Sequence, residues 1–153
     1  MKLAEALIER ASLQKQNRAI VRHIEENVKI PEDEEPTVSI DNLMRQYEIN
    51  MGRLSELIRR INKTNSLTEM NGGTITDAIA RRDCLTSQIR AYNDIYDKAI
   101  RHDRDRYGSN EVRVKYVRYV NCAELKDRID HLSQEFRLLD TALQGKNWTV
   151  DLI

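Results

Sequence analysis

Polar residues that interrupt apolar helical stripes are the chemically most informative feature of this sequence. Arg10, Gln14 and Asn17 lie in the middle of one stripe, and Arg82 lies within another. Buried polar groups must be paired, because an unpaired one costs several kcal/mol. These side chains therefore form either a structural hydrogen-bond network that sets helix register or a small-molecule or ion site where two helical hairpins meet. This predicted polar cluster comprises Glu5, Arg10, Gln14, Asn17, Asn62, Asn65, Arg82 and Asp83.

The charge of Arg82 needs a partner if the residue faces the interior. We expect it to pair with Glu5 or Asp83.

A second group of residues combines basic and aromatic side chains. Its central members are Arg101, Arg104, Arg106, Tyr107 and Arg113, and Lys115, Tyr116, Arg118 and Tyr119 follow. Side chains of these types contact phosphate groups and stack on bases. Acidic residues lie among them, however, and the net charge of the chain is zero, so nothing draws it generally to nucleic acid. We expect a solvated or inter-subunit surface here, with nucleic acid disfavoured as a partner.

Metal, cofactor and catalytic motifs are absent from the sequence. A di-iron bundle needs Glu-x-x-His pairs, and none of His23, His102 and His131 has a glutamate three residues earlier. No Cys-x-x-Cys, phosphate-binding or dinucleotide-binding motif is present. We therefore predict no metal, no cofactor and no catalytic residue. Cys84 and Cys122 sit in helical patterns, which favours the reduced thiols of a cytoplasmic protein.

Length and composition predict a single helical domain over residues 1–153. Charged residues make up 33% of the chain, with one Phe, one Trp, two Pro and five Gly, a composition that favours long charged helices. No apolar run approaches the roughly 18 residues of a membrane span. Glu5, Glu9 and Arg10 interrupt the first twenty residues, which excludes a signal-peptide core. We therefore expect a cytoplasmic protein.

Four segments have the apolar spacing of helices, with steps that alternate between three and four residues. They cover residues 2–29, 39–62 and 74–103, and a last segment between a predicted cap at Asn121 and a C-terminal cap at Gly145. The acidic, proline-containing run 30–38 separates the first two, which should pack as an antiparallel hairpin. The second helix has a coiled-coil-like seam of Ile40, Met44, Tyr47, Met51, Leu54, Ile58 and Ile61.

A small β element completes the predicted fold, which is mainly α, with four long helices as antiparallel hairpins or a bundle. Residues 111–120 alternate apolar and basic side chains with the period of a strand. The C-terminal tail, 146–153, either adds to this element or docks on its own helix ends or on a neighbouring subunit. The Asn71-Gly72 dipeptide is typical of a hairpin turn, so a very short two-stranded ribbon is also compatible with the sequence.

An ordered set of motifs resembles the septicolysin-like family of small bacterial proteins. The motifs are MKLAEALIERASLQKQ, INKTNS, GGTITDAIARRD, RDRYGSNEVR and LDTALQGKNWTVDL, which together cover essentially the whole chain. The resemblance implies an α-helical fold that assembles as a homo-oligomer. The family name implies a pore-forming cytolysin.

The sequence thus favours a cytoplasmic, homo-oligomeric helical protein with a scaffold or interaction role, whose main partner is a second copy of itself. One alternative is a ligand-binding protein or an enzyme that uses the polar cluster, with a ligand that the sequence does not identify. A second alternative, which follows from the resemblance, is a pore-forming cytolysin. The long apolar seams favour the first hypothesis, because one short chain offers few elements to cover them.

Overall fold

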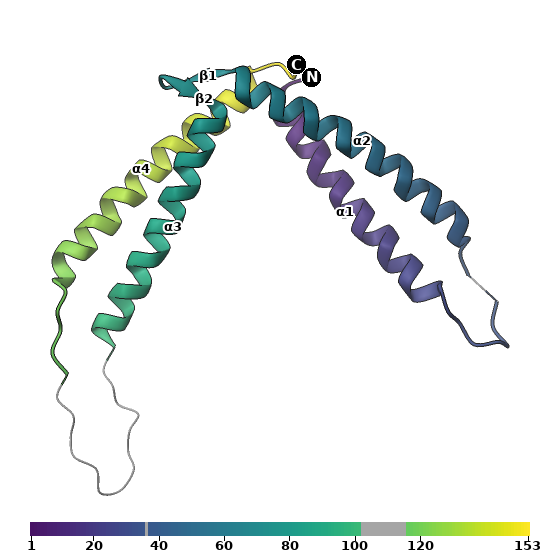
Figure 1. The fold of residues 1–153 in the computed structure, drawn as a ribbon, viewed down its shortest axis with the longest axis horizontal. Coiled ribbons are helices and arrows are strands. Elements are labelled where there is room, and N and C mark those ends of the chain that lie inside the picture. Colours follow the sequence, from purple (N-terminus) through teal and green to yellow (C-terminus); the bar gives the residue numbers. More distant parts are fainter. Residues whose placement is uncertain (36, 102–115) are drawn as a thin grey trace, which may run out of the picture. The chain divides into compact units, whose positions relative to one another are not determined.

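The structure is a computed structural model that describes residues 1–35, 37–101 and 116–153. It confirms a mainly α fold with a small β element (Figure 1). The elements are α1 (Leu3–Asn27), α2 (Ile40–Leu67), β1 (Glu69–Met70), β2 (Gly73–Thr74), α3 (Ile75–Ile100) and α4 (Cys122–Thr149). They belong to two compact units, Met1–Thr76 with Gln144–Ile153, and Asp77–Leu143. The single domain over 1–153 stays a prediction.

Helices α1 and α2 form the hairpin of the first unit. Helix α2 begins after Ser39, whose hydroxyl accepts a hydrogen bond from the Asn42 N–H at 3.3 Å and so caps the helix. Arg53 on α2 forms an ion pair with Glu9 on α1 at 2.5 Å, so the two helices lie side by side. The predicted hairpin is therefore present.

The buried face of α2 differs from the predicted one. Met44 and Met51 are 49% and 40% exposed, whereas the buried residues are Asn50, Leu54, Leu57, Ile61 and Thr64. The predicted and the observed lines share Leu54 and Ile61 and both step by three and four residues. The packing buries the line of residues that includes Asn50 and Thr64. A search for apolar periodicity does not find this line, because these two side chains are polar.

Helix α2 also extends to Leu67, five residues beyond the predicted end of this segment at residue 62. Polar side chains in this last part bond to the helix itself. The Thr64 hydroxyl donates to the Arg60 carbonyl at 2.9 Å, and the Ser66 hydroxyl donates to the Lys63 carbonyl at 3.0 Å. Burial of Ile61 and Thr64 then outweighs the weak helix propensity of the segment. Asn62 and Asn65 are consequently helical residues.

The β element is a two-residue hairpin at Asn71-Gly72. These residues have φ values of 52° and 83°, the left-handed backbone that a type I′ turn requires at both central positions. Glu69 pairs with Thr74, and Met70 with Gly73. The strand predicted at residues 111–120 is absent where the structure describes this segment. Residues 116–120 are not a strand, and residues 111–115 lie outside the described residues. Alternation alone makes no strand without a partner for the backbone groups.

The C-terminal segment docks on helix ends of its own chain. The Leu3 N–H donates to the Val150 carbonyl and the Leu152 N–H donates to the Met1 carbonyl, both at 2.9 Å. The Ile153 N–H donates to the Thr64 hydroxyl at 3.0 Å. This is one of the two docking alternatives that the sequence left open.

Helix α4 does not end at Gly145, as the sequence analysis predicted, but at Thr149. Trp148 therefore lies in the last helical turn, where it is 57% exposed, instead of in a docked tail. A helical glycine costs only about 1 kcal/mol, and the backbone bonds that follow at 150–153 hold the helix end in place.

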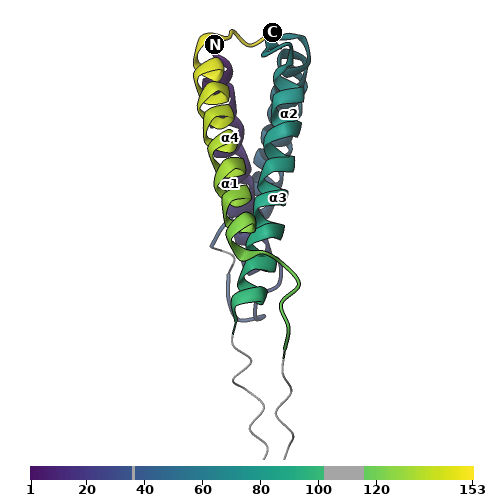
Figure 2. The ribbon, with the colours of Figure 1, turned by 90° about the vertical axis from the view of Figure 1, so that its left-hand side faces the viewer.

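Helices α3 and α4 lie side by side in the second unit (Figures 1 and 2). Their predicted stripes are confirmed, with Ala78, Leu85, Ile129 and Leu143 buried. The Arg81 guanidinium pairs with the Glu135 carboxylate at 2.7 Å across the two helices.

The predicted cap at Asn121 is also confirmed. Its side-chain oxygen accepts hydrogen bonds from the N–H groups of Ala123 at 3.0 Å and Glu124 at 3.3 Å. Helix α4 therefore starts at a position that local chemistry determines.

Candidate interaction site at the end of helix α3

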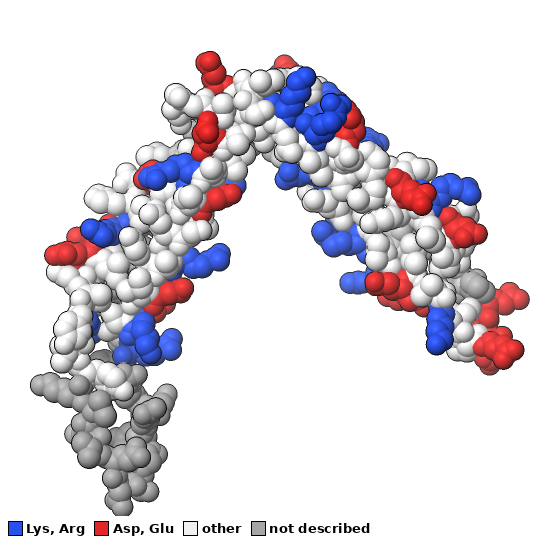
Figure 3. Space-filling view, in the orientation of Figure 1, with Lys and Arg blue, Asp and Glu red and all other residues white. Residues whose placement is uncertain are grey.

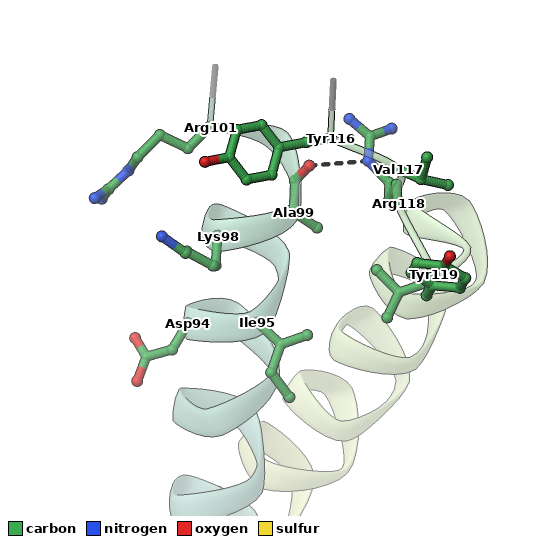
Figure 4. A pocket seen from close by; sticks show the side chains of 10 residues that line it. Asp94, Ile95, Lys98, Ala99, Arg101, Tyr116, Val117, Arg118 and Tyr119 are labelled. Atoms are coloured by element: carbon green, nitrogen blue, oxygen red, sulfur yellow. Dashed lines mark hydrogen bonds between the residues drawn. The ribbon is translucent and has the colours of Figure 1, made fainter. Parts of the chain in front are cut away.

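A hollow of about 870 Å³ lies between the last two turns of α3 and the segment 116–120 (Figure 4). A volume of this size lies within the range of small-molecule and cofactor sites. The residues that line it are Asp94, Ile95, Lys98, Ala99, Arg101, Tyr116, Val117, Arg118, Tyr119 and Val120.

The end of helix α3 positions the segment that forms the other wall. The last carbonyl groups of a helix have no partner within the helix. The Arg118 Nε donates a hydrogen bond to one of them, the Ala99 carbonyl, at 2.9 Å (Figure 4). A cation at this position also interacts favourably with the negative end of the helix dipole. This contact and the cap at Asn121 place residues 116–120 beside the last turns of α3.

The lining of the hollow is cationic. Lys98, Arg101 and Arg118 contribute three positive charges, and Asp94 contributes one negative charge. Among the described residues, Lys98 and Arg101 have no ion-pair partner within 4.0 Å. Within the described part of the chain, no ion pair therefore engages these two cations.

The same hollow exposes apolar and aromatic side chains. Val117 is 63% exposed, Tyr119 93% and Ile95 44%. These three side chains offer apolar surface next to the cations of the same hollow. The chemistry is therefore that of non-covalent binding, with apolar contacts surrounded by cations.

Sequence reasoning identified part of this site. Arg101 was predicted as a member of the basic and aromatic group, and it lines the hollow. Arg104, Arg106, Tyr107 and Arg113 lie outside the described residues. Sequence reasoning missed Asp94, Ile95 and Lys98. The spacing of Asp94 and Lys98 before Arg101, seven and three residues, places all three on one helix face and was the available signal.

The residues of the predicted polar cluster differ in exposure, each within its own unit, and their role as a cluster stays a prediction. Glu5 is exposed and its carboxylate accepts a hydrogen bond from the Lys2 N–H at 2.7 Å, at the start of α1. Gln14 and Asn62 are exposed, and Asn65 is half-buried. Arg82 lies in the second unit, pairs with Asp83 at 2.9 Å and has a side chain that is 33% exposed.

Arg10 and Asn17 are the members of that cluster with buried polar atoms. Among the described residues, the Nε atom of Arg10 and the Oδ1 atom of Asn17 have no hydrogen-bond partner, whereas the Asn17 Nδ2 donates to the Met51 sulfur at 3.4 Å. The two residues are seven positions apart on α1, about 10 Å along the helix axis. The sequence did not single out Asn50 and Gln46, whose side chains form a 2.9 Å hydrogen bond in the same hairpin.

No group of three or more His, Cys, Asp or Glu side chains suited to a metal ion occurs within residues 1–35, 37–101 and 116–153. Cys84 is exposed, and both cysteines have free thiols. None of the helices in the described part of the chain has the length and apolar character needed to cross a membrane.

Comparison with known proteins gives a family. Residues 10–152 match the sequence model of DUF6847, a family of unknown function. The chain belongs to this family. A similar solved structure is the crystal structure of a functionally unknown conserved protein from Corynebacterium diphtheriae, with 32% sequence identity and a TM-score of 0.90. The alignment covers 100% of this DUF6847 chain and 99% of that chain. No curated protein matches significantly.

The predicted resemblance to the septicolysin-like family is wrong. The match to DUF6847 over residues 10–152 replaces it, and the related crystal structure is of a protein of unknown function. The motifs that suggested the resemblance lie largely in charged helices, whose short patterns recur in unrelated proteins. The cytolysin alternative depended on that resemblance and falls with it.

Proposed function

We propose that this DUF6847 protein is a homo-oligomeric scaffold or interaction protein of the cytoplasm. The observation that supports the proposal is the hollow at the end of α3, which combines exposed apolar side chains with three cations. Protein interfaces are enriched in aromatic residues and arginine, and a few such residues carry most of the binding energy. Tyr116, Tyr119, Arg101 and Arg118 supply these residue types.

Self-association is supported by the side of the α1–α2 hairpin as well. Met44 and Met51 lie one heptad apart on α2 and stay 49% and 40% exposed beside the buried seam. Met51 also contacts Asn17, whose Oδ1 atom is buried and finds no hydrogen-bond partner in the part of the chain that the structure describes. A polar residue in an apolar seam specifies register and oligomer state in helical assemblies.

The test is the molar mass of the purified chain in solution. We expect multi-angle light scattering at micromolar concentration to give a multiple of the 17.9 kDa chain mass. Val117→Ser with Tyr119→Ser should lower that mass or weaken the assembly. The matched control is Leu138→Ser, because Leu138 is 67% exposed on α4 and does not line the hollow. A monomeric wild-type chain would refute the proposal of a homo-oligomer.

A second candidate is small-molecule binding along α1, which is favoured by the buried Arg10 Nε and Asn17 Oδ1 atoms, since neither has a hydrogen-bond partner among residues 1–35, 37–101 and 116–153. A ligand that satisfies them would raise the melting temperature of the wild-type protein but not that of Asn17→Leu. If Asn17→Leu is simply more stable and every compound that shifts the wild type shifts it equally, this candidate is excluded.

A further inference from the structure

We infer that the hollow at the end of α3 receives the acidic segment 32–35 of a second copy of this chain. This inference rests on the proposed self-association and names the two surfaces that meet. It follows from charge, exposure and the apolar residues that flank each surface.

The acidic segment lies in the connection between α1 and α2. Glu32, Asp33, Glu34 and Glu35 are all exposed, and Figure 3 shows acidic side chains gathered at this end of the hairpin. The Glu34 N–H donates to the Pro31 carbonyl at 3.2 Å, so a turn presents the carboxylates to solvent. Among the described residues, no cationic group forms an ion pair with any of these four carboxylates.

The hollow has the complementary charge. Lys98, Arg101 and Arg118 line it against one carboxylate, Asp94, whereas the segment carries four negative charges and no positive one. The guanidinium groups of Arg101 and Arg118 have a planar donor geometry that matches carboxylates. Because the net charge of the whole chain is zero, two copies do not repel each other overall, and the local charges can steer the encounter.

Apolar residues accompany the charges on both surfaces. Val28, which is 66% exposed, and Pro31 lie just before the acidic residues, and Ile95 and Val117 are exposed in the hollow. An apolar contact surrounded by ion pairs is the common anatomy of a protein interface. The volume of 870 Å³ also exceeds what a few isolated ions would need.

The two surfaces are different parts of the chain, so two copies either exchange segments about a two-fold axis as an isologous pair or make a heterologous contact. Heterologous contacts close into a ring or propagate as a filament, depending on the rotation between copies. In every case each copy has one acidic segment to offer and one hollow to fill. This property allows a charge-swap experiment.

The first variant reverses the segment from four negative charges to a net charge of +2, with Glu32→Lys, Asp33→Lys and Glu34→Lys. The second reverses the hollow from a net charge of +2 to −2, with Lys98→Glu and Arg101→Glu. Each variant alone should weaken self-association at least about tenfold, because two like-charged surfaces then meet. An equimolar mixture of the two should associate within about threefold of the wild type, because each surface again meets an opposite charge. Sedimentation velocity measures all three affinities.

Matched controls separate this effect from misfolding and from general charge. Glu48→Lys reverses an exposed charge on α2 outside both surfaces and should leave the affinity unchanged. All changed residues are exposed, so circular dichroism and melting temperature should stay at the wild-type values. Raising the salt concentration should weaken wild-type association through screening of the ion pairs.

Three results would overturn the inference. A wild-type chain that stays monomeric removes both this inference and the proposed homo-oligomer. A wild-type oligomer that the reversals leave unchanged, or a mixture that does not recover, removes only this inference. If the Lys98→Glu, Arg101→Glu variant keeps its self-association but loses binding of a labelled single-stranded RNA oligonucleotide, the hollow is a nucleic-acid site.

Discussion

Replacing Thr64 with valine should release the C-terminal segment from helix α2. Thr64 is completely buried, with an exposed fraction of 0%. Its hydroxyl accepts the Ile153 N–H at 3.0 Å and donates to the Arg60 carbonyl at 2.9 Å. Valine has nearly the same shape but no hydroxyl, so the Thr64→Val variant removes the acceptor while it fills the space.

The expected magnitude follows from these contacts. A buried donor that loses its acceptor costs about 1–3 kcal/mol. Ile153 remains 48% exposed, so water compensates in part, and we expect the lower part of that range, about 1–2 kcal/mol. Loss of the hydrogen bond from the Thr64 hydroxyl to the Arg60 carbonyl adds little to this cost, because that carbonyl belongs to the helix. A change of this size multiplies the opening equilibrium of the segment by about 5–30.

Amide hydrogen exchange measures this opening directly. The N–H groups of Leu3 and Leu152 join the C-terminal segment to the start of the chain, so their exchange reports its release. In Thr64→Val both should exchange about 5–30 times faster than in the wild type. The control is Thr64→Ser, which keeps the hydroxyl and loses one methyl group, at a cost of about 1 kcal/mol to the fold.

The comparison between the two variants decides the matter. If Leu3 and Leu152 exchange at the same rate in Thr64→Val and Thr64→Ser, the hydroxyl does not hold the segment. The reasoning above would then be refuted, even if both variants are less stable than the wild type.

Three further predictions concern other contacts. Leu85→Ala should lower the free energy of unfolding by about 3–5 kcal/mol in urea titrations, because Leu85 is fully buried. Cys84→Ala, at the neighbouring exposed residue, should leave the free energy of unfolding almost unchanged. Arg82→Ala should cost less than about 1 kcal/mol in the same assay, because its pair is partly exposed; a loss above 3 kcal/mol would contradict this. A hydrogen bond from Lys2, and then its charge, lower the pKa of Asp151. The stabilising contribution of Asp151 should therefore be present above the ordinary aspartate pKa and be lost as the pH falls through the pKa of Asp151 in the folded protein. Lys2→Ala should remove this acid dependence of the melting temperature.

Local chemistry explains the features that the sequence predicted correctly. The cap at Asn121 and the turn at Asn71-Gly72 depend on residues within a few positions of each other. The apolar stripes of α3 and α4 depend only on helical spacing, and their central residues Leu85 and Ile129 are buried as expected. Such features need no knowledge of what packs against them.

The candidate site was predicted only in part, because its two walls lie far apart in the sequence. The basic and aromatic residues of the later wall were visible as a cluster, and Arg101 and Arg118 belong to it. Ile95 and Lys98 look like ordinary residues of a charged helix. The contact between Arg118 and the Ala99 carbonyl, together with the cap at Asn121, places them beside residues 116–120.

Tertiary packing alone decided the face of α2 and the end of α4. Two lines of residues with the same three-and-four spacing compete on α2, and the line with Asn50 and Thr64 is the buried one. On α4, Gly145 is a local signal to stop, yet the backbone bonds of Val150 and Leu152 to the start of the chain favour continuation. Sequence patterns therefore determined where helices form. Contacts between distant residues determined which face of α2 is buried and where α2 and α4 end, because these contacts outweigh helix propensities of about 1 kcal/mol per residue.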